Sequence, residues 1–181
     1  MQFAKDTFFV TLRDRLSALN PERTIVLDGQ SRPAVVSPEN EAVTEVDPSV
    51  VGVDFTQPIS QRSAIPNAFY LQWGALRAAD NFQSSPRPLL ALDCKIAFSS
   101  GGVAGGAGND RGRAVNALEL ELLQICAPPF AEKRDYTQSP ATDLGTRIVW
   151  TRPRFTMPQS QGALLQASAS LTVFFMPEME D

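Results

Sequence analysis

Apolar residues recur at helical spacing in two parts of the chain. The first stripe lies between residues 6 and 19 and consists of Phe8, Phe9, Leu12, Leu16 and Leu19. The second lies between residues 113 and 126 and consists of Val115, Leu118, Leu122, Ile125 and Cys126. Spacings of three and four residues place each set on one face of an α-helix. We therefore predict two amphipathic helices, ended by Asn20-Pro21 and by Pro128-Pro129.

Apolar and polar residues alternate in two longer segments, which predicts strands. In residues 89–99 one face carries Leu90, Leu92, Cys94, Ile96 and Phe98. In residues 163–176 one face carries Leu165, Ala167, Ala169, Leu171, Val173 and Phe175. The opposite faces hold small, hydroxylated and charged residues, so we expect them to meet solvent or another subunit. Asp93 and Lys95 share one such face, where they could pair, and we interpret them as solvated residues rather than a catalytic dyad.

Four shorter segments also have strand character. Residues 24–27 and 34–36 flank Asp28-Gly29, a dipeptide that accepts positive φ in a tight turn, and they predict a hairpin. Residues 68–74 and 146–153 alternate between apolar and polar positions, which predicts two further strands.

Three segments show no regular period. Residues 77–88 and 129–145 read as polar, irregular connections. Residues 37–66 contain four prolines, with Val50, Val51, Val53 and Phe55 as apolar anchors. A loop of this length is usually functional or disordered. We interpret it as an arm that orders against a neighbouring subunit; the alternative is a surface loop packed on its own domain.

The order of these elements predicts one α+β domain over residues 1–181. Its core is an antiparallel β-sheet with two helices packed on one face, and long loop or arm segments leave this body. The acidic tail, residues 177–181, is expected to be mobile.

Composition then narrows the function classes. The chain has no histidine, the side chain that most often acts as a general base near neutral pH, so Ser-His-Asp and Cys-His mechanisms are excluded. Cys94 and Cys126 lie in apolar runs and are predicted to be buried free thiols, too few for a zinc site. A net charge of −4 argues against generic nucleic-acid binding. We expect no enzymatic chemistry, no metal and no cofactor.

The start of the chain does not resemble a secretion signal. It carries charges at Lys5, Asp6, Arg13 and Asp14 and has no apolar h-region. No apolar stretch approaches the roughly 20 residues needed to span a bilayer. We therefore expect a soluble protein that is made in the cytoplasm and has no membrane partner.

A glycine-rich loop occupies residues 101–112, between the predicted strand 89–99 and the second helix. A strand, a glycine loop and a helix in this order also describe a phosphate cradle. Residues 108–113, however, read Gly-Asn-Asp-Arg-Gly-Arg and lack the Gly-Lys-Ser/Thr of that motif. We interpret the loop as flexible or interface-forming, with a small-molecule or nucleotide site as the lower alternative. Its candidate contact residues are Gly101, Gly105, Asp110, Arg111 and Arg113.

In layout, most of the chain resembles the tail terminator, or tail completion, proteins of tailed bacteriophages. The features that carry the resemblance are the opening helix 8–19, the hairpin at Asp28-Gly29, the strand 89–98, the glycine-rich break, the helix 113–126 and the closing strand 164–175. The resemblance implies a virion subunit that is assembled in the host cytoplasm. It would form a homo-hexameric ring that caps the tail tube, stops tube polymerisation and joins the tube to neck proteins. DNA would pass through the ring without sequence-specific contacts. Another neck, tube or baseplate subunit is the alternative.

Overall fold

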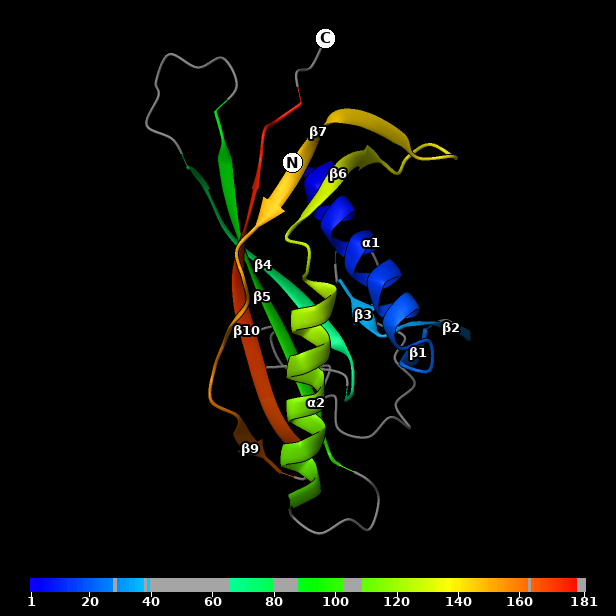
Figure 1. Cartoon of the computed structure of the whole chain (residues 1–181), viewed down its shortest axis with the longest axis vertical. Coiled ribbons are helices and arrows are strands. Elements are labelled where there is room, and N and C mark those ends of the chain that lie inside the picture. The colour runs from blue at the N-terminus through cyan, green and yellow to red at the C-terminus, as the bar shows by residue number, and fades with distance from the viewer. Residues whose placement is uncertain are drawn as a thin grey trace.

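The computed structural model describes residues 1–27, 29–37, 39, 66–79, 88–102, 109–162 and 164–178. It has mixed α and β content, with two helices and a mostly antiparallel, curled β-sheet, as the predicted α+β class requires (Figure 1). The helices are α1 (Gln2–Leu19) and α2 (Asn109–Ile125). The strands are β1 (Thr24–Leu27), β2 (Gln30–Pro33), β3 (Val35–Val36), β4 (Phe69–Ala78), β5 (Leu90–Ser100), β6 (Phe130–Asp135), β7 (Thr142–Trp150), β8 (Arg154–Phe155), β9 (Gln159–Gln161) and β10 (Leu164–Phe175).

The main sheet has the strand order β3-β4-β5-β10-β7-β6, and β8 and β9 also pair with β10. Its centre is the long antiparallel pair β5 and β10, which runs from Leu165 opposite Ser100 to Phe175 opposite Leu90. The apolar faces predicted for these two strands are confirmed. Their fully buried members are Leu92, Cys94, Ile96, Phe98, Ala167, Ala169, Leu171, Val173 and Phe175.

Both helices contribute to one hydrophobic core with the strands. Helix α1 lies against β6, β7 and β3, and α2 lies against β5 and β10. The Phe8 ring makes edge contacts with Trp73, at 5.7 Å between ring centroids, and with Trp150, at 5.1 Å. These aromatic contacts attach α1 to strands on both sides of the central pair. Neither of the two described helices is long and apolar enough to cross a membrane.

Both helices begin earlier than predicted. Helix α1 starts at Gln2 rather than residue 6, and α2 starts at Asn109 rather than residue 113. The last part of the predicted glycine-rich loop is therefore helical. The residues of both predicted apolar faces are buried, with one exception. The Leu19 side chain, at the last position of α1, is 44% exposed.

The predicted hairpin has the right turn but the wrong second strand. Gly29 has a φ of +70° in the turn, and Leu27 pairs with Gln30, so β2 is the segment directly after the turn. Strand β3 instead joins the main sheet, where Val35 and Val36 pair in parallel with the start of β4. Both valines are buried. Burial of apolar surface is favourable, which explains why the most apolar part of this segment pairs with the main sheet and not with β1.

Residues 129–145 are not an irregular connection. They contain β6 and the first part of β7, which pair in an antiparallel hairpin. The sequence of β6 is Phe-Ala-Glu-Lys-Arg-Asp, whose charged residues gave no apolar alternation from which a strand could be predicted. In the same way, β4 continues to Ala78, so residues 77 and 78 belong to a strand and not to a loop.

The start of the acidic tail is held in place. The Glu178 carboxylate pairs with Lys133 Nζ at 2.8 Å and also with the amino group of Met1. Lys133 is 1% exposed, and its ammonium also donates to the Met176 carbonyl oxygen at 2.6 Å. The expectation of a mobile tail is therefore wrong for Glu178, and residues 179–181 lie outside the described residues.

Candidate functional site

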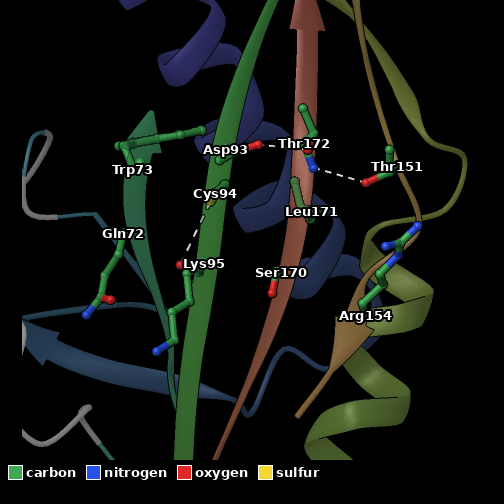
Figure 2. A pocket seen from close by; sticks show the side chains of 11 residues that line it. Gln72, Trp73, Asp93, Cys94, Lys95, Thr151, Arg154, Ser170, Leu171 and Thr172 are labelled. Atoms are coloured by element: carbon green, nitrogen blue, oxygen red, sulfur yellow. Dashed lines mark hydrogen bonds between the residues drawn. The ribbon is translucent and has the colours of Figure 1, made fainter. Parts of the chain in front are cut away.

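A groove of about 570 Å³, with both polar and apolar lining, opens on one face of the central strands (Figure 2). Strand alternation supplies most of its lining, because every second residue points to this face. The lining polar side chains are Gln72 from β4, Asp93 and Lys95 from β5, Ser170 and Thr172 from β10, and Thr151 and Arg154 from the segment after β7. This belongs to the small, hydroxylated and charged face that the sequence predicted for β5 and β10; the contributions of β4 and residues 151–154 were not predicted. The expectation that the whole face is open is wrong for Ala91, Ala97, Ser99 and Ser168, which are buried.

Asp93 is held in place by its neighbours in this groove. Its carboxylate accepts a hydrogen bond from the Thr172 hydroxyl at 2.9 Å and forms an ion pair with Arg77 on β4. The hydrogen bond from Arg77 is the main cause that lowers the pKa of Asp93, and the bond from Thr172 adds to it. Asp93 is therefore ionised near neutral pH, and its partner is Arg77 rather than Lys95.

The two remaining cations of the groove have no acidic partner among the residues that the structure describes. Lys95 and Arg154 are exposed, and neither forms an ion pair with any carboxylate in the described parts of the chain. Both lie directly beside Ser170, which is opposite Lys95 in the β5 pairing and opposite Arg154 in the β8 pairing. Within the described part of the chain, the centre of the face therefore carries two cations without an ion-pair partner around an exposed hydroxyl group.

A second hollow of about 240 Å³ continues this surface along β10. Lys95 lines both hollows, and Gln166, Ser168 and Met157 belong to the second one. Met157 is 87% exposed, so this hollow offers one large apolar side chain beside its polar groups. We use the name "open face" for the surface formed by these two hollows.

The open face offers hydrogen-bonding groups but no activated nucleophile. Ser170 and the threonines have no imidazole nearby, because the chain has none. Burial raises the pKa of Cys126 to about 12, and the pKa of Cys94 is raised even further by the same cause. In the described parts of the chain, no cluster of three Cys, Asp or Glu residues could hold a metal ion. The arrangement suits contact with another polar surface.

The glycine-rich loop forms part of a tight junction at the start of α2. Gly102 has a φ of +76°, and a Cβ atom there would lie 3.2 Å from the Arg111 nitrogen and 3.3 Å from atoms of Asp110. Arg111 also donates to the Gly162 carbonyl oxygen at 3.4 Å. Asp110 places a negative charge in the first turn of α2, where it interacts favourably with the positive end of the helix dipole. The same charge would repel a phosphate group bound at this position.

The predicted interface residues are thus only partly brought together. Gly101, Asp110 and Arg111 lie at this junction, and Arg113 is exposed on α2 one turn further on. Val50, Val51, Val53, Phe55 and Gly105 lie outside the described residues.

A further surface was missed by the sequence reading. The ends of the two helices form an apolar hollow of about 400 Å³, lined by Ala18, Leu19, Ile125, Ala127 and Pro128 among others. Leu19 is 44% exposed at this hollow. Leu123, which stands outside the predicted apolar stripe of α2 and is 41% exposed, lines a separate hollow of about 310 Å³ with Ala127 and Pro129.

No protein-family model matches the chain, and no curated protein matches its sequence.

Proposed function

We propose that this protein is a structural subunit that acts by self-assembly, most specifically as a tail terminator ring of a phage or phage-like tail. The observation that carries the proposal is the open face. It extends over the longest strands of the sheet, yet most of its side chains are polar or charged, and Lys95, Ser170 and Arg154 at its centre are exposed in the single chain. Such a face is suited to pack against the sheet or loop of another subunit.

The fold supports this proposal in one further way. We propose that α1 and α2 both cover the face opposite to the open face, so that one side of the sheet builds the domain core. The contacts of α1 with Trp73 and Trp150, and of α2 with β5 and β10, favour this two-layer arrangement. The other side then remains available for assembly.

In the proposed role, six copies form a closed ring that caps the tail tube and joins it to the neck. Closed symmetry limits growth, whereas an open head-to-tail contact would extend without limit. The protein then works through its surfaces and carries out no reaction.

Light scattering of the purified protein, with negative-stain imaging of the eluted species, tests the proposal. A closed ring of about six subunits supports the terminator role. Long tubes would favour a tube subunit instead. A monomer at every concentration would contradict self-assembly by this chain.

A further inference from the structure

The outer edge of β4 is unpaired over most of its length. Strand β3 pairs with Phe69 and Tyr70 at the start of β4, and β5 covers the other side of the strand. No strand in the described parts of the chain lies beside β4 between Gly74 and Ala78. These residues are all exposed, and the Leu76 side chain retains 46% of its accessible surface. Figure 1 shows that β4 and β5 project here as a ribbon from the body of the sheet.

The backbone of this edge is able to receive another strand. Ala79 donates its backbone N–H to the Leu89 carbonyl oxygen at 2.7 Å, on the β5 side. Backbone groups alternate in direction along a strand, so those of Ala78 and Leu76 point away from β5. Unpaired N–H and C=O groups in a row are a template for strand addition.

The last described residue before position 40 lies near this edge. Strand β3 runs parallel to β4, and Glu39 follows it after two residues. The Glu39 carboxylate lies 2.7 and 2.8 Å from Lys5 Nζ, and Lys5 Nζ lies 5.7 Å from the centroid of the Trp73 ring. Glu39 is therefore near the level of Trp73, where the unpaired edge begins.

One stretch of residues 40–65 has the composition of a strand that fits this edge. Residues 50–55 read Val-Val-Gly-Val-Asp-Phe, rich in the β-branched and aromatic residues that favour strands. In an added strand, Val51, Val53 and Phe55 share one face and Asp54 takes the other. The apolar set can then cover Leu76, while Asp54 lies on the face that carries Arg77.

We infer that residues 50–55 of a second copy of this chain add to the β4 edge at Gly74–Ala78. The inference rests on the proposed self-assembly and identifies one of its contacts. Ten residues separate Glu39 from Val50, and ten separate Phe55 from Pro66. Each connection can span about 36–40 Å when extended. That is roughly the diameter of a compact domain of this size, so the segment has the reach to cross to a neighbouring subunit.

Cross-linking between separately purified cysteine variants tests the inference. Ala78→Cys chains are mixed with Val53→Cys chains, allowed to assemble, and treated with a short bismaleimide. Cys94 and Cys126 are 2% and 3% exposed, and the wild-type protein serves as the control for their reactivity. We expect a covalent two-chain product at roughly tenfold or greater yield over a matched mixture of Ser31→Cys and Val53→Cys, because pairing raises the local concentration of the two thiols. Ser31 is exposed on β2, which belongs to a separate two-stranded sheet.

The double variant Ala78→Cys/Val53→Cys separates pairing between chains from pairing within one chain. Pairing between copies gives a ladder of linked chains, whereas a product confined to the single-chain mass means that the segment covers its own β4 edge and overturns the inference. Light scattering of the same samples separates the two proposals. Normal assembly without the two-chain product overturns this inference alone, and a chain that remains monomeric without the product overturns the proposed function as well.

Discussion

The Trp150 indole N–H donates a hydrogen bond to the Cys126 carbonyl oxygen, 2.9 Å away in the buried core. This bond joins the end of β7 to the residue that follows α2. Both elements were predicted from sequence, but their connection through one side chain was not. It fixes how the helix end meets the sheet.

Replacement of Trp150 by Phe should lower the free energy of unfolding by about 1–3 kcal/mol, since it leaves a buried carbonyl oxygen without its donor. Trp73→Phe is the matched control. Trp73 also contacts Phe8, but its indole nitrogen has no acceptor among the described residues. Urea unfolding measures both variants. Equal losses would mean that the effect at Trp150 comes from packing and not from the hydrogen bond.

Arg15 should be important for stability because its guanidinium satisfies three carbonyl groups beyond its own helix. It donates to the Ile125 oxygen at 3.0 Å, to Pro128 at 2.7 Å and to Phe130 at 3.0 Å. Arg15→Met should cost about 2–4 kcal/mol, because the acceptors lose a charged donor. Arg113→Met, at an exposed position of α2, should change stability by less than about 0.5 kcal/mol. Similar values for both variants in urea unfolding would contradict this role.

Glu178 should stabilise the protein in a pH-dependent way. Burial opposes its ionisation, but the hydrogen bonds from Lys133, its own backbone and the Met1 amine outweigh burial and lower its pKa from 4.5. A lowered pKa in the folded state means that the stabilisation is present above the unfolded pKa and is lost as pH falls through the folded pKa. Glu178→Gln should therefore cost about 1–3 kcal/mol at pH 7, because the buried Lys133 loses its counter-charge.

Denaturant unfolding of Glu178→Gln and wild type from pH 7 downward checks this prediction. The difference in unfolding free energy should narrow as the pH falls through the lowered pKa of Glu178, where the carboxylate of the wild type becomes protonated. Glu132→Gln is the control, because Glu132 and its partner Arg147 are 39% and 64% exposed and such pairs contribute about 0–1 kcal/mol. A difference that does not change with pH would exclude the Glu178 charge as its cause.

Two glycines in the same region should respond to alanine in opposite directions. Gly102→Ala should destabilise by about 1–2 kcal/mol, since it combines a positive φ with a Cβ atom 3.2 Å from the backbone of α2. Gly112 is inside α2, and nothing lies within 4 Å of the position of its Cβ. Gly112→Ala should therefore stabilise by about 0.5–1 kcal/mol. Thermal unfolding of both variants measures the signs, and a neutral Gly102→Ala would contradict the tight junction.

Ser170→Trp should block assembly without unfolding the protein. Ser170 is exposed at the centre of the open face, so a large side chain there projects into the proposed interface. Light scattering should show smaller species than the wild type, with little change in melting temperature. Ser31→Trp on β2 is the control and should assemble normally. Wild-type assembly of Ser170→Trp would exclude this part of the open face from the contact.

The candidate surface was only partly predictable from sequence. The alternation in residues 89–99 and 163–176 indicated that Asp93, Lys95 and Ser170 share a polar face. It could not indicate that Arg154 borders this face, because the segment after β7 reaches β10 through contacts with no local period. The partner of Asp93 was also beyond prediction, since Arg77 meets it only through the pairing of β4 with β5.

Both helices, the two central strands and their buried faces could be predicted from the sequence alone. These features follow from the spacing of apolar residues, which is a local property of the chain. Three further features become evident only in the folded chain: β3 adds in parallel to β4, the charged segment Phe130–Asp135 is a strand, and Lys133 is buried beside Glu178. Each of these depends on residues far apart in the chain, whose hydrogen bonds and charges are satisfied only when the whole sheet is assembled.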